Sequence, residues 1–193
     1  MILVPLISGT IESLPRPFDL QPLTLNQIVQ DLAEYYRQTG NAVDLLLIGG
    51  LALQAYGYAE RVTIDVDGEL VGELDPLMTF LQQRQIPADL GENISGWSIV
   101  AMPPGYRERT SVWYEEPGMR LRLLAPVDFI LAKLRRGTDQ DLDDAEYVAT
   151  QYEVSPAVVQ ASADSAIKAS PQDTALFLFK KTVENFCQRK ISE

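Results

Sequence analysis

The first third of the chain combines helical periodicity with a buried strand. Apolar side chains recur at helical spacing between Thr24, which can cap a helix, and Gly40, which can end one. The wholly apolar run at residues 45–48 stops at Gly49-Gly50 and predicts a strand buried on both faces. Residues 51–56 then predict a helix that begins at the glycine turn.

Strand patterns dominate the middle of the chain. Polar and apolar side chains alternate at residues 62–66, which predicts a second strand with two chemically distinct faces. Further strands are expected at residues 97–101, 111–114 and 119–124. Because Pro117-Gly118 separates the last two, they are expected to form a hairpin.

The remaining segments have helical patterns. Asp75 followed by Pro76 is typical of a helix start. Other helices are expected from Pro126, from Asp139 and, as a final pair, within residues 156–190. This order predicts a mixed α/β (α+β) fold, with a mixed sheet flanked by helices and a helical C-terminal part.

Composition narrows the functional classes. A net charge of −11 repels a nucleic-acid backbone, so we expect no general DNA binding, although a metal ion could still bring in a phosphorylated small molecule. The chain has no histidine, which excludes His-ligated zinc and serine–histidine or cysteine–histidine nucleophiles. Its one cysteine, Cys187, cannot form an internal disulfide.

The N-terminal residues show no targeting pattern. Residues 1–7 are apolar but lack a basic lead-in and are interrupted by Pro5, so we expect an extended arm and not a signal peptide. No apolar run approaches the roughly 18 residues that span a bilayer. The expectation is therefore a cytoplasmic protein without a membrane partner.

Two aspartates are the main candidates for chemistry. On a strand, Asp65 and Asp67 would leave the same face with their Cα atoms about 6.5–7 Å apart. Such a pair suits Mg²⁺, which takes one or two protein carboxylates and fills its other positions with water and phosphate oxygens. An ordinary polar strand face, or neutralisation by Arg61, is the alternative. Since like charges on one face repel, a metal ion explains the pair better.

The glycine pair strengthens this interpretation. Between a strand and a helix, Gly49 and Gly50 could let backbone N–H groups approach a phosphate. The alternative is a tight turn that allows close packing of the helix on the sheet. It is the aspartate pair one helix later that favours a nucleotide site.

Residues 47–57, followed by Asp65 and Asp67, resemble the signature of minimal nucleotidyltransferases of the polymerase-β-like superfamily, and in particular its AbiEii-like branch. The resemblance implies a nucleotidyltransferase-like sheet on which the two aspartates hold Mg²⁺ (or Mn²⁺) and position a nucleoside triphosphate. The residues implied to bind the nucleotide are Gly49, Gly50, Arg61 and Thr63.

A second block, residues 123–144, is similar to the post-catalytic helix of that branch and its acidic continuation. There a helical lysine lies near the nucleotide phosphates, so the resemblance implies a catalytic role for Lys133; a solvated helix face is the alternative. We accordingly expect an arm at residues 1–23, a nucleotidyltransferase-like domain at 24–150 and C-terminal helices at 151–193 packed on it.

The third metal carboxylate of the superfamily comes from a later strand, and here the sequence departs from the pattern. The expected equivalent, residues 97–101, contains no acidic side chain, which leaves Glu69, Glu115 or Glu116 as substitutes. Metal assistance contributes several kcal/mol of transition-state stabilisation. A catalytically degenerate member that acts as a binding or regulatory module is therefore the alternative function.

The leading hypothesis is a metal-dependent transfer of a nucleoside monophosphate from a nucleoside triphosphate to an RNA or protein acceptor. The AbiEii-like resemblance implies a toxin–antitoxin or defence system with a cognate partner. Acidic charge favours a protein acceptor unless four arginines form a patch. These are Arg107, Arg109, Arg135 and Arg136. A haloacid-dehalogenase-like phosphohydrolase also uses Asp-x-Asp, but directly after its first strand, where this chain has Gly49-Gly50.

Overall fold

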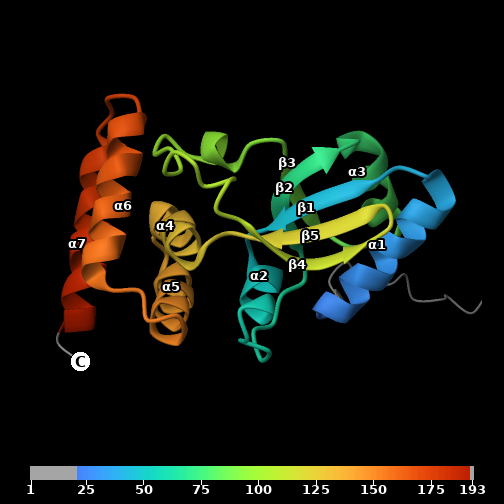
Figure 1. Cartoon of the computed structure of the whole chain (residues 1–193), viewed down its shortest axis with the longest axis horizontal. Helices are drawn as coiled ribbons and strands as arrows, with labels where there is room; N and C mark the ends of the chain where they lie inside the picture. The colour runs from blue at the N-terminus through green and yellow to red at the C-terminus, as the bar shows by residue number, and fades with distance from the viewer. Residues whose placement is uncertain (1–20, 192–193) are drawn as a thin grey trace, which may run out of the picture.

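The computed structural model describes residues 21–191. Its centre is a five-stranded mixed sheet with the strand order β3-β2-β1-β5-β4 (Figure 1). The strands are β1 (Val43–Leu47), β2 (Val66–Gly72), β3 (Ala88–Gly91), β4 (Ser111–Glu116) and β5 (Met119–Leu123). The fold class is therefore the predicted mixed α/β arrangement. Residues 1–20 of the predicted arm lie outside the described residues.

The sheet is built around β1, the strand predicted at residues 45–48. Leu45, Leu46 and Leu47 are fully buried, as a strand covered on both faces requires. Strand β1 pairs in parallel with β5 and antiparallel with β2, which in turn pairs in parallel with β3. Strands β4 and β5 form the predicted hairpin.

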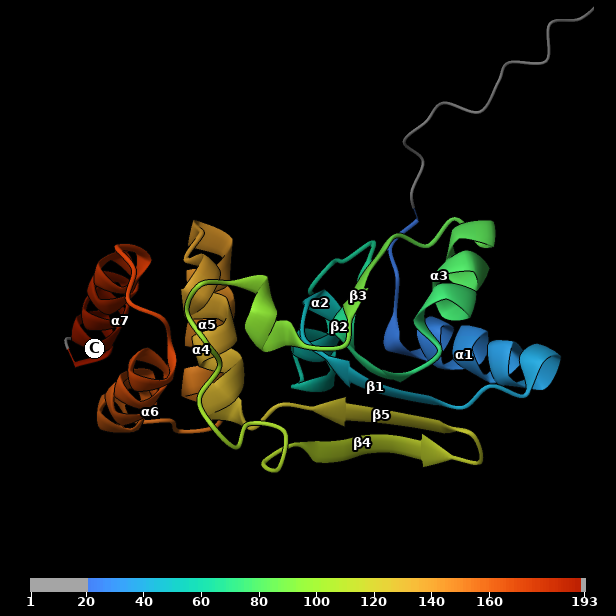
Figure 2. The same cartoon turned by 90° about the horizontal axis from the view of Figure 1, so that it is seen from above.

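Helix α1 (Leu25–Thr39) confirms the first helical prediction. The Thr24 hydroxyl accepts a hydrogen bond from the Gln27 N–H at 3.3 Å, and the chain leaves the helix at Gly40 with φ +73°. Ile28, Leu32 and Tyr35 point into the core. Figure 2 shows α1 on the same side of β1 and β5 as α2 (Gly50–Ala55) and α3 (Leu74–Gln83).

The C-terminal part is helical, as predicted. Its helices are α4 (Pro126–Arg136), α5 (Asp139–Gln151), α6 (Pro156–Ala169) and α7 (Ala175–Ile191). Helices α4 and α5 pack together beside one end of the sheet, while α6 and α7 pack on each other and on α4 (Figures 1 and 2). None of the described helices is long and apolar enough to span a lipid bilayer.

The strand predicted at residues 62–66 is wrong, because β2 begins only at Val66. Before it, residues 62–65 make a single antiparallel bridge, in which the Leu23 N–H donates to the Thr63 carbonyl at 2.7 Å. Thr63 is buried, whereas Val62 and Ile64 are exposed. Buried and exposed side chains do alternate here, but the polar residue, Thr63, faces inward and the apolar ones face outward.

The strand predicted at residues 97–101 is also wrong. The segment begins with a 3₁₀ turn, η1 (Ile94–Trp97), and three consecutive backbone N–H groups then donate to serine hydroxyls and not to a neighbouring strand. These are the N–H groups of Val100, Ala101 and Met102, which bind Ser98, Ser170 and Ser95 at 3.2, 2.8 and 2.9 Å. The next strand after β2 is instead the unpredicted β3.

The helix start predicted at Asp75-Pro76 is displaced by a short distance. Helix α3 begins at Leu74, with Glu73 at the N-cap position, and Asp75 lies in its first turn. An acidic residue there still interacts favourably with the helix dipole. The element was therefore predicted correctly and its boundary was not.

Candidate functional site

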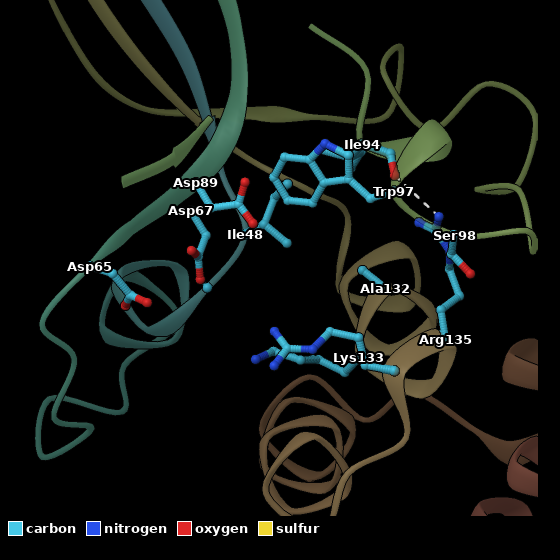
Figure 3. Close-up of a pocket in the computed structure, with 12 residues that line it drawn as sticks. Ile48, Asp65, Asp67, Asp89, Ile94, Trp97, Ser98, Ala132, Lys133 and Arg135 are labelled. Carbon is cyan, nitrogen blue, oxygen red and sulfur yellow. Dashed lines mark hydrogen bonds between the residues drawn. The ribbon is translucent and has the colours of Figure 1, made fainter. Parts of the chain in front are cut away.

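A cleft of about 590 Å³ lies between the ends of β1, β2 and β3 and helix α4 (Figure 3). In Figure 3 the sheet side carries Asp65, Asp67 and Asp89, and Lys133 extends toward them from α4. The other lining residues are Ile48, Gly49, Ile94, Trp97, Ser98, Ala132, Arg135 and Arg136. The structure thus brings four of the candidate site residues, Asp65, Asp67, Gly49 and Lys133, to one cavity.

The two aspartates reach the cleft from different backbone settings. Asp67 is the second residue of β2, whereas Asp65 lies in the bend before that strand and accepts a hydrogen bond from the Thr63 hydroxyl at 2.6 Å. The same-face argument from strand alternation is therefore wrong in detail. Both carboxylates nevertheless line the cavity, so the predicted pairing of these residues at one site is retained.

The surroundings of Asp67 disfavour its negative charge. Partial burial, followed by repulsion from Asp65 and then Asp89, raises the pKa of Asp67 to about 6. Lys133 and Arg136 act in the opposite direction and do not compensate. A cation placed between these carboxylates would remove the repulsion.

Asp89 was missed by the sequence analysis. Strand β3 runs parallel to β2, and Asp89 is the register partner of Asp67. Neighbouring strands lie about 4.8 Å apart, which brings a third carboxylate to the same edge of the sheet. The short sequence Ala-Asp-Leu-Gly has one buried apolar residue, Leu90, and too little alternation to be recognised as a strand.

Close packing explains the glycine pair. A Cβ atom on Gly49 would lie 2.0 Å from an Asp67 carboxylate oxygen, and one on Gly50 would lie 2.5 Å from the Thr63 Cβ. Only glycine lets the loop that carries the aspartates lie directly against this turn. The close packing that was considered as the alternative role of Gly49 and Gly50 is thus present. The same packing fixes the position of Asp67.

Lys133 is not on a solvated helix face, since its side chain is 7% exposed. Its ammonium group donates to Asp144 at 2.8 Å and to Asp141 at 3.5 Å, both on α5, and it lies 5.5 Å from the centre of the Phe129 ring. These contacts hold the cation at the wall of the cleft.

Arg61 does not neutralise Asp65 and Asp67. It forms an ion pair with Asp144, with Nε at 3.1 Å from one carboxylate oxygen. It nevertheless lines a second, smaller cavity of about 250 Å³ that adjoins the first. The residues shared by the two cavities are Gly49, Asp65, Asp67, Lys133 and Arg136. The smaller cavity adds Gly50, Arg61, Val62, Thr63, Ile64, Gln140 and Asp141.

The three glutamates considered as substitutes for a third carboxylate all lie outside both cavities. Glu69 is buried and accepts hydrogen bonds from Arg107 at 2.5 Å and from Tyr106 at 2.6 Å. Glu115 pairs with Arg120 at 2.5 Å. Glu116 accepts from a tyrosine hydroxyl at 3.1 Å.

The four arginines that were considered as a patch do not all reach the cleft. The Glu69 carboxylate holds Arg107 and raises its pKa, and Asp128 does the same for Arg109 through two hydrogen bonds of 2.8 Å. Of the four arginines, only Arg135 and Arg136 line the cleft. The structure therefore places two arginines at the cleft, while the other two are engaged by buried carboxylates.

The donor set fits Mg²⁺ without forming a closed cage. Among residues 21–191 no three acidic or thiol side chains converge as a ready-made metal site. Mg²⁺ needs only one or two protein carboxylates when water and substrate phosphates complete its shell. A cation bound there would relieve the repulsion that Asp65 and Asp89 exert on Asp67.

Comparison with known proteins identifies the family of the chain. The fold is nucleotidyltransferase-like, with a mixed sheet flanked by helices. The model of a protein family described as "Nucleotidyltransferase of unknown function (DUF6036)" matches residues 23–188, and the chain belongs to this family. No curated protein and no solved structure matches the chain.

Proposed function

We propose that this chain is a divalent-metal-dependent nucleotidyltransferase, which transfers a nucleoside monophosphate from a nucleoside triphosphate to an acceptor hydroxyl. The observation that carries the proposal is the contrast between the carboxylates of the cleft, which are partly buried or exposed, and the buried carboxylates of the fold. Asp65, Asp67 and Asp89 form no ion pair with any residue in the described part of the chain.

By contrast, each fully buried carboxylate has a cationic partner within 3.5 Å. The pairs are Asp31 with Arg84, Glu69 with Arg107, Asp128 with Arg109, Asp141 with Lys133, and Asp144 with Lys133 and Arg61. A fold that neutralises its buried acids and leaves three acids at one cleft unpaired is suited to an external cation.

In the proposed site, Asp65 and Asp67 hold Mg²⁺ or Mn²⁺ and Asp89 is the third carboxylate. When bound, such an ion neutralises phosphate charge and favours attack by an acceptor hydroxyl. The pairing of Asp89 with Asp67 supports an active enzyme over a degenerate member, because it supplies an acid on a strand next to β2.

The smaller cavity is the proposed triphosphate site. It is polar, and Gly49, Gly50, Arg61 and Thr63 contribute to its wall. Lys133 borders both cavities, which suits a cation that stabilises charge on the phosphates. Asp141 and Asp144 keep its side chain in that position.

The proposed step is a substitution at the α-phosphorus. The acceptor oxygen forms a bond to phosphorus while the bond from that phosphorus to the α–β bridging oxygen breaks. Pyrophosphate leaves with the electron pair of the broken bond, and the hydroxyl proton passes through a carboxylate of the cleft to water. The resemblance to the AbiEii-like branch supports a toxin–antitoxin or defence setting with a cognate partner protein.

The test is transfer of label from each α-³²P nucleoside triphosphate, with Mg²⁺ or Mn²⁺, to RNA or protein of a cell lysate. We expect metal-dependent labelling from the α position and none from the γ position. Asp67→Asn and Asp89→Asn should each reduce labelling about 10³-fold, equivalent to about 4 kcal/mol of transition-state stabilisation. Asp164→Asn, a change of an exposed aspartate on α6, is the matched control.

Three results would contradict the proposal. Transfer that survives Asp67→Asn would move the site elsewhere. Metal-dependent nucleotide binding without transfer would favour the degenerate binding module. A phosphorylated Asp65 that transfers the γ-phosphate to water would favour the phosphohydrolase hypothesis.

A further inference from the structure

The larger cavity contains features that metal and triphosphate chemistry leave unused. Its wall away from the aspartates combines an aromatic ring, Trp97, with a guanidinium group, Arg135. Apolar side chains of Ile48, Ile94 and Ala132 lie between and beside them. In Figure 3 the indole ring of Trp97 is seen between Asp89 on the sheet side and Arg135 on the side of α4.

Trp97 is a half-exposed ring on a firmly held segment. Its side chain packs over Gly91 of β3, where a Cβ atom would lie 2.9 Å from the indole nitrogen. The 3₁₀ turn that ends at Trp97 is fixed from β2, because the Ile94 N–H donates to the buried Glu69 carboxylate at 3.0 Å. Even so, Trp97 remains 44% exposed. A rigid aromatic surface beside a cavity is a suitable platform for a planar ligand.

Arg135 has spare hydrogen-bonding capacity. Its Nη2 donates to the carbonyl groups of Ile94 and Ser95 at 3.1 and 2.9 Å. Its Nε is buried without a hydrogen-bond partner, and no carboxylate pairs with Arg135 in the described part of the chain. Burial lowers the pKa of Arg135 to about 10, so the group stays cationic at neutral pH. By contrast, Lys133, Arg61 and Arg136 all pair with aspartates of α5.

We propose that this part of the cleft is an acceptor subsite for a nucleotide, whose base stacks on Trp97 and whose phosphate binds Arg135. The role of this nucleotide as the acceptor rests on the proposed function. Binding of a nucleotide at Trp97 and Arg135 does not depend on it. A ribose hydroxyl of this nucleotide would face the carboxylate edge of the cavity and make the attack described above.

The division of the site into two cavities leaves room for a second ligand beside the triphosphate. Asp89 lines only the larger cavity, whereas Gly50, Arg61 and Thr63 line only the smaller one. The two cavities therefore separate a phosphate-sized polar space from a space that suits a ring. A volume of about 590 Å³ also lies within the roughly 300–1,000 Å³ of small-molecule sites.

Charge limits the length of the ligand. The chain carries a net charge of −11, and Arg107 and Arg109 are engaged by Glu69 and Asp128. A long polynucleotide would find no continuous basic track. The site therefore suits a free nucleotide or the terminal nucleotide of an RNA, which share the same ring and phosphate.

Tryptophan fluorescence can test binding at this position directly. Trp113→Phe leaves Trp97 as the single tryptophan of the chain. The four ribonucleoside 5′-monophosphates, their nucleosides and inorganic phosphate are each titrated in EDTA, so that metal binding plays no part. We expect saturable quenching by at least one monophosphate, at least about 10-fold weaker binding of its nucleoside, and no quenching by inorganic phosphate.

Matched variants assign the contacts. In the Trp113→Phe background, Arg135→Gln should weaken the monophosphate about 10-fold or more, and Arg135→Lys less, because lysine keeps the charge. Arg120→Gln, which changes an exposed arginine of β5, should bind as the background does. Circular dichroism of each variant shows whether it is folded, and Trp97→Phe, which retains Trp113, should show no quenching.

Simultaneous binding separates acceptor from donor. The titration is repeated with Mg²⁺ and saturating α,β-methylene triphosphate analogues, which cannot transfer their nucleotide. Undiminished quenching supports an acceptor subsite, whereas competitive displacement assigns the cavity to the donor nucleoside and overturns the proposal. Absence of quenching by all four monophosphates, or quenching unaffected by Arg135→Gln, also overturns it. A trinucleotide that binds more tightly than its terminal mononucleotide identifies an RNA end; equal or weaker binding identifies a free nucleotide.

Discussion

The carboxylates of this protein form two groups that differ in their partners and in their position. Those inside the fold, such as Asp128 and Glu69, are held by arginines at 2.5–2.8 Å. Those at the cleft, Asp65, Asp67 and Asp89, repel one another and have no ion pair among residues 21–191. In the sequence the two groups cannot be distinguished, because all of these acids lie near apolar runs. The structure separates acids that stabilise the fold from acids available to a ligand.

The difference has an energetic meaning. A buried carboxylate without a cationic partner is costly, so the hydrogen-bonded ion pairs of the buried acids contribute to the stability of the fold. An acid at a cleft remains in contact with water, so it needs no cationic partner from the protein and is available to bind an external cation. Substitutions in the first group should therefore affect stability, and those in the second should affect metal binding.

The largest effect is expected at Asp128, which is fully buried and receives two hydrogen bonds from Arg109. Asp128→Asn keeps the volume and removes the charge, and should lower the free energy of unfolding by about 3 kcal/mol. Urea denaturation measures this change. Asp164→Asn on the exposed face of α6 should change stability by less than about 0.5 kcal/mol. Equal effects of the two substitutions would erase the distinction between the groups.

A smaller and pH-dependent effect is expected at Glu69. Burial alone would raise its pKa, but hydrogen bonds from Arg107, Tyr106 and the Ile94 N–H lower it below the usual value of a glutamate. Folding thus favours the carboxylate form, whose stabilisation is complete above the ordinary pKa and is lost as the pH falls through the lowered one.

Accordingly, Glu69→Gln should cost about 2 kcal/mol at pH 7 and progressively less below about pH 4. Urea denaturation across this pH range measures the change. Glu115→Gln, which removes an exposed partner of Arg120, should cost less than about 1 kcal/mol. A Glu69→Gln deficit that stays constant down to pH 3 would show that the lost stability is not linked to ionisation.

The smallest effect belongs to the cleft. Mg²⁺ at roughly ten times its dissociation constant should raise the free energy of unfolding by about 1.4 kcal/mol. Asp67→Asn should abolish this gain. Without metal the variant should be at least as stable as the parent, because it removes the repulsion from Asp65 and Asp89. If Asp67→Asn instead destabilises the metal-free protein as much as Asp128→Asn, then Asp67 belongs with the structural acids.

Much of the fold could be predicted because its elements carry strong local signals. Thr24 and Gly40 bound α1, and the leucines of β1 lead directly to Gly49. Part of the site followed from this order, since Asp67 and Lys133 reach the same cavity. These predictions rest on periodicity and spacing, which depend on residues close together in the chain.

The remainder depends on distant contacts. Asp89 becomes a neighbour of Asp67 only through the parallel pairing of β3 with β2. Residues 97–101 have strand-like composition, but the amides of residues 100–102 bind serine hydroxyls, one of them that of Ser170, the C-cap residue of α6. Arg61 is adjacent to the aspartates in sequence and is drawn instead to Asp144 of α5. No local pattern encodes these choices.

The segment at residues 100–102, whose backbone N–H groups donate to serine hydroxyls, has a consequence for how the sequence of such a protein can change in evolution. In a sheet, every residue of a strand shares one register, so inserting a residue disturbs the whole ladder. The amides of Val100, Ala101 and Met102 are instead fastened one by one, each to its own hydroxyl. Insertions and substitutions there leave the strands with Asp67 and Asp89 in place. The wall that carries Trp97 can therefore change in sequence while the carboxylates of the cleft keep their positions.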